Sequence, residues 1–131
     1  MIEITNQSQH KIAVIEDEPS IRMLYETKLG LSGFTVKSAA NGVEGLALIR
    51  DFAPDLILLD ILMPQMNGDE MLRQLREQDW GANVRVVVLT NISRDEAPSI
   101  LRFLRIDRYV VKAHHTPSQI VEIVREVLHI K

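Results

Sequence analysis

The side chains best suited to chemistry come directly after short apolar runs. Two carboxylates follow residues 11–15, one follows residues 56–59, a threonine closes residues 84–90 and a lysine closes residues 108–112. In chain order these side chains are Glu16, Asp17, Asp60, Thr90 and Lys112. Carboxylate oxygens suit Mg²⁺, and a carboxylate can attack a phosphoryl group to give an acyl phosphate. An ammonium and a hydroxyl can bind phosphoryl oxygens. The residue types therefore fit magnesium-dependent phosphoryl transfer, with Asp60 as the candidate nucleophile.

The apolar runs predict the strands that would position these side chains. Residues 56–59 are apolar at every position, which is typical of a strand covered on both sides in a parallel sheet. A helical pattern follows each predicted strand. The strands are predicted at 11–15, 34–38, 56–59, 84–90 and 108–112, with helices that begin near residues 19, 42, 67, 93 and 116.

Two of these helices are predicted from capping-box spacing, in which a polar residue precedes Glu by three positions. Asn67 and Glu70 have this spacing before one helix, and Ser93 and Glu96 have it before the next. Pro98 fits the early part of the latter helix. The last helix is expected to open at residues 116–119.

Strict alternation of five strands with five helices indicates an α/β fold, a five-stranded doubly wound parallel sheet with a flavodoxin-like (βα)5 arrangement. Strand order 2-1-3-4-5 fits five such units best. This order brings the carboxyl ends of strands one, three, four and five together at one edge. Three carboxylates gathered there would repel one another unless a cation neutralised them, which again favours a bound Mg²⁺.

Composition narrows the class of protein further. The chain has 131 residues, enough for one domain, and no cysteine, which excludes disulfides and thiolate chemistry. A formal net charge of -3 gives no sign of a nucleic-acid or membrane surface. No stretch is long and apolar enough for a membrane span. We expect residues 1–10 to form a loosely ordered leader, residues 11–130 to form the domain, and the protein to be cytoplasmic.

Together these stretches resemble a response-regulator receiver domain of two-component signal transduction, of the single-domain kind found in chemotaxis regulators. The resemblance covers residues 11–130 and includes the spacing between its pieces. The pieces are Glu16-Asp17, Asp60-x-x-x-Pro64-x-Met66-Asn67-Gly68, Thr90 and Tyr109-x-x-Lys112.

The resemblance implies that Asp60 takes a phosphoryl group from a phosphohistidine on a sensor histidine kinase or phosphotransfer protein. It implies that Asp17, Asp60 and the Leu62 backbone carbonyl hold Mg²⁺, with Glu16 acting mainly through water. Thr90 and Lys112 would contact the phosphoryl group. Such a domain is not an enzyme beyond catalysing its own phosphorylation and dephosphorylation.

The resemblance also implies a switch pair, Thr90 and Tyr109. When Thr90 moves toward the phosphoryl group, Tyr109 can turn inward into the space that Thr90 leaves. This would change the surface formed by the helix expected from residue 93, the strand at 108–112 and the helix from residue 116. A downstream target protein or a second copy of the chain would bind there.

Four departures from the family pattern stand out. Ala113 follows Lys112 where the family usually has a proline after a cis peptide. A cis bond before alanine would cost roughly 2.5–4 kcal/mol, so either the loop is strained or it takes another path. Asn91 replaces a small residue after Thr90. A turn with two arginines, at residues 105–108, replaces a glycine-containing one beside the expected partner surface.

The fourth departure concerns water. Leu62 and Ile92 lie two residues beyond Asp60 and Thr90, at positions that tune how water reaches the acyl phosphate in the family. Apolar side chains cannot orient an attacking water by hydrogen bonding. We therefore predict a long-lived phosphoryl state.

Other readings of the sequence stay open. A pseudo-receiver would bind partners without phosphorylation. A flavodoxin-like nucleotide or flavin binder is disfavoured, because the acidic loop at residues 16–18 would repel a phosphate. A phosphohydrolase is disfavoured because Leu62 stands where a second carboxylate would act as general acid. Since the sequence ends after the last predicted helix, we expect a stand-alone domain that acts through a partner.

Overall fold

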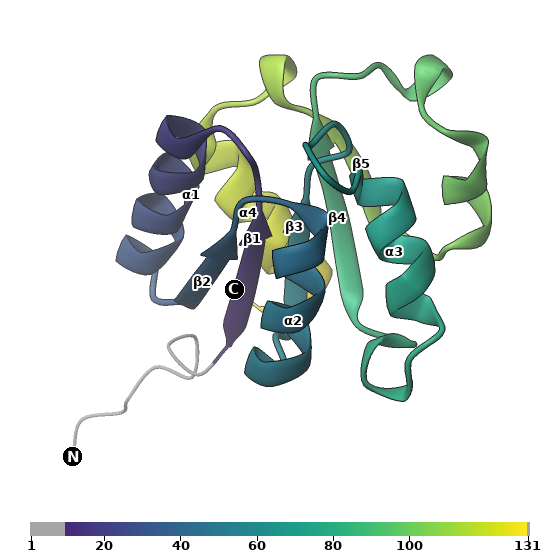
Figure 1. Cartoon of the computed structure of the whole chain (residues 1–131). Helices are drawn as coiled ribbons and strands as arrows, with labels where there is room; N and C mark the ends of the chain where they lie inside the picture. The colour runs from purple at the N-terminus through teal and green to yellow at the C-terminus, as the bar shows by residue number, and fades with distance from the viewer. Residues whose placement is uncertain (1–9, 131) are drawn as a thin grey trace.

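A computed structural model describes residues 10–130 of the chain. It consists of one parallel sheet with helices on both faces (Figure 1). The strands and helices, in chain order, are β1 (Lys11–Ile15), α1 (Pro19–Leu31), β2 (Thr35–Ala39), α2 (Gly42–Phe52), β3 (Leu56–Leu59), α3 (Gly68–Arg76), β4 (Arg85–Thr90), β5 (Arg108–Val111) and α4 (Pro117–Leu128).

The sheet confirms the predicted fold class and strand order. Its five strands are all parallel and run β2-β1-β3-β4-β5. All four residues of β3 are buried, as expected for the central strand. Because β3 lies between β1 and β4, the polar residues that follow these strands meet at one edge of the sheet.

Alternate strand residues face two separate cores. Ala13 and Ile15 of β1 pack with apolar residues of α2 and α3, whereas Ile12 and Val14 pack with those of α1 and α4. This alternation holds the helices against opposite faces of the sheet. The strand ends are thereby fixed in position by buried contacts on both sides.

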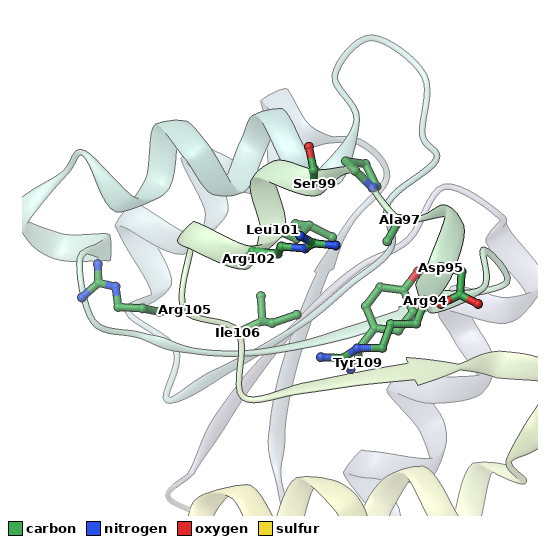
Figure 2. A pocket seen from close by; sticks show the side chains of 10 residues that line it. Arg94, Asp95, Ala97, Ser99, Leu101, Arg102, Arg105, Ile106 and Tyr109 are labelled. Carbon is green, nitrogen blue, oxygen red and sulfur yellow. The ribbon is translucent and has the colours of Figure 1, made fainter.

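The helix predicted from residue 93 does not form. The chain there makes two short 3-10 turns, Arg94–Glu96 and Ser99–Phe103, which lie over β5 (Figure 2). Ser93 donates its side chain to Glu96 and caps no backbone N–H. Ala97, the residue before Pro98, is extended, as proline requires of its predecessor. Pro98 therefore divides the segment into pieces too short for an α-helix.

A capping box forms at the last helix and is absent from the two places where the sequence predicts one. Thr116 and Gln119 form a reciprocal capping box at the start of α4. Asn67 is the N-cap residue of α3, but its side chain accepts a 3.0 Å hydrogen bond from the backbone N–H of Met63. The capping box expected from Asn67 and Glu70 was therefore wrong.

The predicted leader falls almost wholly outside the described residues, which begin at His10. The backbone carbonyl of His10 accepts a 3.0 Å hydrogen bond from the N–H of Thr35 in β2. Within residues 10–130, every helix is too short or too polar to cross a membrane.

Candidate functional site

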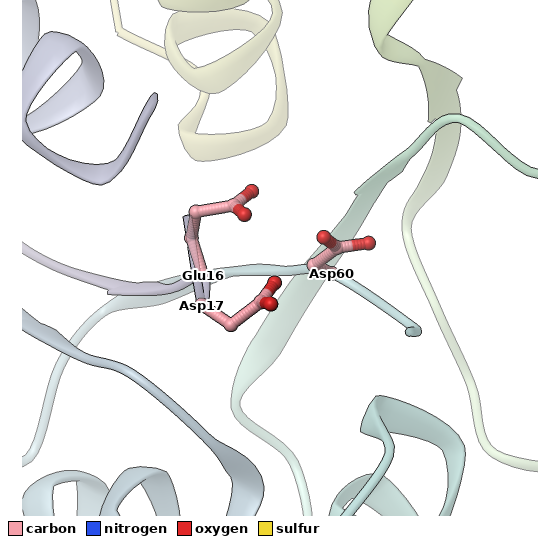
Figure 3. Close-up of side chains that lie close together, drawn as sticks. All are labelled: Glu16, Asp17 and Asp60. Carbon is pink, nitrogen blue, oxygen red and sulfur yellow. The ribbon is translucent and has the colours of Figure 1, made fainter. Parts of the chain in front are cut away.

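Three carboxylates meet at the carboxyl edge of the sheet (Figure 3). Glu16 and Asp17 follow β1, and Asp60 follows β3. Each offers an oxygen atom that lies within 4.8 Å of the other two. The backbone N–H of Asp60 donates to the Ile15 carbonyl at 3.0 Å, which extends the ladder between the two strands to the site. The sequence-based prediction that these three residues come together is confirmed.

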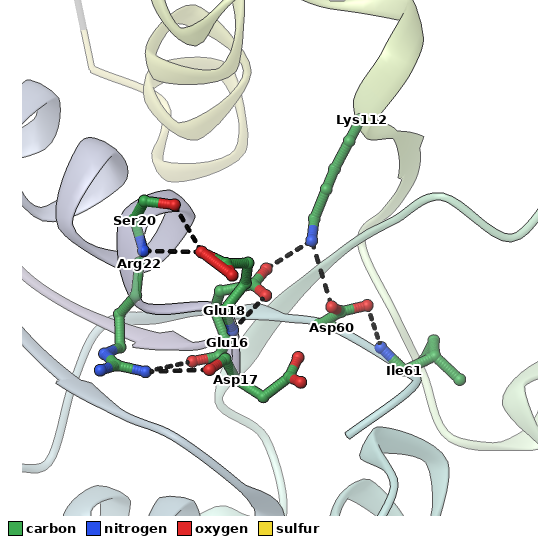
Figure 4. A network of polar contacts seen from close by, with 8 residues as sticks. All are labelled: Glu16, Asp17, Glu18, Ser20, Arg22, Asp60, Ile61 and Lys112. Carbon is green, nitrogen blue, oxygen red and sulfur yellow. Dashed lines mark hydrogen bonds and ion pairs between the residues drawn. The ribbon is translucent and has the colours of Figure 1, made fainter. Parts of the chain in front are cut away.

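Lys112, which directly follows β5, bridges two of the three carboxylates (Figure 4). Its ammonium donates to Glu16 Oε1, and its Nζ lies 3.1 Å from Asp60 Oδ2. The side chains of Lys112, Glu16 and Asp60 are only 11%, 5% and 9% exposed. A buried ion pair persists only when its charges are compensated, and here one ammonium serves two carboxylates.

Lys112 reaches the site without the cis peptide that the family usually has. The described residues contain no cis peptide bond. The chain instead turns directly into a 3-10 turn at Lys112–His114. Ala113 left two possibilities, a strained loop with a cis peptide or a loop with another path. The loop takes another path, and the Lys112 ammonium still lies beside Glu16 and Asp60.

Burial and charge shift the pKa values of this pair. Burial raises the pKa of the Glu16 carboxyl above 4.5, and the nearby Asp60 charge adds to the rise, although Lys112 opposes it. Burial by itself would lower the pKa of the Lys112 ammonium, but its hydrogen bond to Glu16 and the charge of Asp60 raise the pKa above 10.5. Three carboxylates share this edge with the single Lys112 ammonium, so carboxylates outnumber the ammonium that pairs with them.

The Asp17 carboxylate is available for a ligand. Within residues 10–130 it takes part in no hydrogen bond or ion pair, whereas the Asp17 carbonyl accepts from Arg22 at 3.4 Å. Arg22 also donates to the Glu16 carbonyl at 2.9 Å. Arg22 thus fixes the backbone that carries both carboxylates. The role of this arginine could not be predicted from the sequence, because a contact to backbone carbonyls leaves no residue-type pattern.

The loop after Asp60 is held close to the sheet by Gly68. Its N–H donates to the Ile61 carbonyl at 2.7 Å, and a Cβ built on Gly68 would lie 2.0 Å from the Asp60 carbonyl oxygen. Only glycine fits this approach. Asp60 Oδ1 accepts a 2.7 Å hydrogen bond from the Ile61 N–H, which orients the carboxylate. Leu62 lies in this loop and is 59% exposed.

Thr90 and Tyr109 lie on the neighbouring strands β4 and β5. Thr90 is buried at the carboxyl end of β4, where it is the register partner of Val111. The Tyr109 hydroxyl donates a 2.7 Å hydrogen bond to the carbonyl of Ile92, two residues beyond Thr90. The tyrosine side chain is therefore tied to the loop that Thr90 begins.

Comparison with known proteins agrees with this geometry. Residues 12–125 match the family model of the response regulator receiver domain. Among solved structures, the chemotaxis response regulator CheY4 of Vibrio cholerae superimposes with a TM-score of 0.82 at 26% identity, covering 90% of this chain and 98% of that chain.

Curated relatives are longer proteins. The probable transcriptional regulator ycf27 of Porphyridium aerugineum is 36% identical over 92% of this chain and 48% of its own length. The DNA-binding dual master transcriptional regulator RpaA of Synechocystis sp. is 33% identical over 64% of this chain and 35% of its own length. The chain thus spans about half the length of the first of these relatives, and the expectation of no nucleic-acid partner finds no support among them.

The predicted sheet, the acidic cluster at its carboxyl edge and the match over residues 12–125 lead to one assignment. The chain belongs to the response regulator receiver domain family, the phosphorylation switches of two-component signalling.

Proposed function

We propose that Asp60 accepts a phosphoryl group from the phosphohistidine of a sensor histidine kinase or phosphotransfer protein. One observation carries the proposal: Asp60 stands within 4.8 Å of two further carboxylates and 3.1 Å from the Lys112 ammonium. In the transfer an Asp60 oxygen forms a bond to phosphorus while the bond from phosphorus to the histidine nitrogen breaks. Lys112, already hydrogen-bonded to Asp60, neutralises charge on the phosphoryl oxygens.

The acidic cluster also fits Mg²⁺. Hard carboxylate oxygens with one uncommitted member, Asp17, form a suitable donor set. Asp17 and Asp60 would hold the ion with the Leu62 backbone carbonyl, and Glu16 would act mainly through water. When bound, the ion supplies the positive charge that brings the phosphoryl oxygens to this acidic site. Because this site holds more carboxylates than ammonium groups, its negative charge favours binding of Mg²⁺.

The switch would act through the loop that joins Thr90 to Tyr109. Thr90 contacts the new phosphoryl group and draws residues 91–93 with it. Because the Tyr109 hydroxyl is hydrogen-bonded to the Ile92 carbonyl, this movement displaces the tyrosine side chain. Tyr109 then turns inward, and the surface of the 94–103 segment, β5 and α4 changes. A downstream target or a second copy of the chain would recognise that surface.

The test is intact mass after incubation with acetyl phosphate, with and without Mg²⁺. We expect a metal-dependent gain of one phosphoryl group in the wild type and its loss in Asp60→Asn. Asp79→Asn is the matched control, since Asp79 is exposed in the turn before β4. An adduct that persists in Asp60→Asn would place the phosphoryl group elsewhere.

Absence of any adduct would instead overturn phosphorylation and favour a pseudo-receiver. Calorimetric titration with Mg²⁺ tests metal binding separately from phosphoryl transfer, because a pseudo-receiver could still bind the ion at Asp17 and Asp60. We also propose a cytoplasmic location.

A further inference from the structure

A pocket of about 310 Å³ lies at the amino edge of the sheet, at the opposite end of the strands from the acidic cluster. Its volume is at the lower end of the range for small-ligand sites. It is formed where the chain leaves α3 and where β4 and β5 begin. Within residues 10–130, three arginines line it: Arg76 of α3, Arg85 at the start of β4 and Arg105 in the turn before β5. None of these arginines belongs to the site proposed for phosphoryl transfer.

The lining of this pocket carries more positive than negative charge. In the described part of the chain, none of the three arginines forms an ion pair with a carboxylate. Asp107 is the one carboxylate among the described lining residues, and its Oδ2 accepts a 2.9 Å hydrogen bond from the backbone N–H of Val86. Three guanidinium groups and one carboxylate leave the lining with a formal charge of +2. A ligand with two negative charges would neutralise it.

Arg76 holds the walls of the pocket together. Its guanidinium donates to the carbonyls of Gly81 and Val84 at 3.1 and 2.7 Å, in the turn after α3. It also donates to the carbonyls of Leu104 and Arg105 at 2.8 and 2.6 Å, in the turn before β5. All four acceptors are neutral, so the charge of Arg76 remains available to attract a ligand. A wall that is formed in advance reduces the entropy lost on binding.

Arg105 has a backbone conformation that glycine would adopt more easily. Its φ is 55°, in the left-handed region, where an L side chain is strained and glycine is not. The side chain points away from Tyr109 (Figure 2), and its guanidinium donates to the Asn83 side chain at 3.0 Å and to the Ala82 carbonyl at 2.6 Å. Both of these acceptors are neutral and both line the pocket. Because strained backbone is concentrated at functional sites, an arginine held in this conformation supports a ligand site here.

Arg85 and Arg105 keep N–H donors for a ligand. Among the described residues, Arg85 donates to the Val127 carbonyl at 3.0 Å and Arg105 donates to the two acceptors above, and each guanidinium carries more N–H groups than these contacts use. Guanidinium groups bind phosphate oxygens through charge-assisted hydrogen bonds in bidentate geometry. We propose that this pocket binds a phosphate dianion, either free or as the terminal group of a small phosphate monoester. A carboxylate fits less well, because its single charge would leave the lining positive.

The test is an NMR titration of the whole chain with sodium phosphate, at constant ionic strength, slightly alkaline pH and without Mg²⁺. We expect saturable shifts of the backbone amides of Asn83 and Asp107. Half-saturation should need about tenfold more phosphate in Arg105→Gly, which removes charged donors but suits the left-handed backbone, and in Arg85→Gln, which leaves that turn unchanged. Arg102→Gln is the matched control, because Arg102 is exposed and lies outside the pocket lining. It should bind phosphate as the wild type does.

A parallel titration with AMP distinguishes the two sources of phosphate, since only a site for monoesters would show the same shifts with AMP. Absence of phosphate-dependent shifts at Asn83 and Asp107 would overturn the proposal. Equal binding of acetate, or equal weakening in Arg102→Gln, would also overturn it by revealing attraction through bulk charge alone. Shifts confined to Asp60 and Lys112 would assign the phosphate to the carboxyl edge instead. Because Asp60 takes no part in this pocket, failure here leaves the proposed phosphoryl transfer unaffected.

Discussion

The Lys112 ammonium lies 3.1 Å from Asp60 Oδ2 and also donates to Glu16, so that one cation joins the ends of β1, β3 and β5. These three strand ends are far apart in the sequence. Their charges compensate one another only in the folded chain. This contact therefore couples the stability of the domain to the same groups that we propose for phosphoryl transfer.

Replacing Lys112 with methionine should leave two buried carboxylates without their cation. We expect the free energy of unfolding to fall by about 1–3 kcal/mol, measured by urea unfolding at neutral pH without divalent ions. Lys28→Met serves as the control, because Lys28 lies on α1 with no carboxylate partner among residues 10–130 and should change stability by less than about 0.5 kcal/mol. Equal stability of Lys112→Met and wild type would show that protons bound by Glu16 and Asp60 replace the Lys112 charge.

Gly68 should tolerate no side chain. A Cβ there would lie 2.0 Å from the Asp60 carbonyl oxygen, so the Gly68→Ala variant must shift the loop that carries the site. We expect a loss of about 2 kcal/mol or more in unfolding free energy. Gly30→Ala is the matched comparison, because a Cβ on that α1 glycine meets nothing within 4 Å. It should stabilise the protein by roughly 0.5–1 kcal/mol. Similar effects at both glycines would contradict the steric argument.

The Tyr109 hydroxyl should protect the loop after β4. Its 2.7 Å hydrogen bond to the Ile92 carbonyl is absent in Tyr109→Phe, which keeps the ring. We expect a loss of about 0.5–1.5 kcal/mol and faster amide hydrogen exchange in residues 92–104. Exchange in β1 and β3 serves as the internal reference. Uniform acceleration across the sheet would point to general destabilisation rather than release of this loop.

Glu70 should titrate far below an ordinary glutamate. Hydrogen bonds from Arg73 and then from Gln74 lower the pKa of its carboxyl from 4.5 to about 2. Because the folded-state pKa is depressed, the contribution of Glu70 to stability is complete above pH 4.5 and is lost as pH falls toward about 2. The effect is small and weakened by salt, since the pair is exposed. Carboxyl NMR of wild type and Arg73→Gln measures the pKa of Glu70. An unchanged titration midpoint in the variant would exclude Arg73 as the cause of the lowered pKa.

The fold and the acidic cluster could be predicted because each follows from local pattern. Buried runs such as residues 56–59 mark parallel strands, and alternation of strands with helices leaves the strand order 2-1-3-4-5 as the best fit. Once that order holds, Glu16, Asp60 and Lys112 must meet at one edge. Their proximity depends on topology and not on any detail of side-chain packing.

The 94–103 segment was mispredicted because two local signals conflict there. Ser93 and Glu96 have the same spacing as Thr116 and Gln119, yet only the second pair caps a helix. The difference is Pro98, which lies five residues after Ser93, where a helix already needs its N–H. Thr116 is instead followed at once by a proline, which suits the first helical turn.

The positions of Arg22 and Arg76 could not be predicted from residue type. Both bind backbone carbonyls, which every residue carries, so neither has a complementary partner in the sequence. Burial of Arg76 lowers the pKa of its guanidinium, a consequence of tertiary packing alone.

Leu62→Asn should shorten the life of the phosphoryl group on Asp60. Leu62 is 59% exposed beside the site, and its apolar side chain can shield the acyl phosphate from water but cannot orient a water for attack. An asparagine amide at this position can orient a water but cannot take its proton, so its effect should be smaller than the 10²–10⁴-fold typical of general acid–base groups. We expect about a tenfold faster loss of phosphate, followed by intact mass after removal of acetyl phosphate. Leu62→Met keeps an apolar side chain of similar size and should decay as slowly as the wild type. If Leu62→Asn decays at the wild-type rate, access of water is controlled elsewhere, with Ile92 as the next position to change.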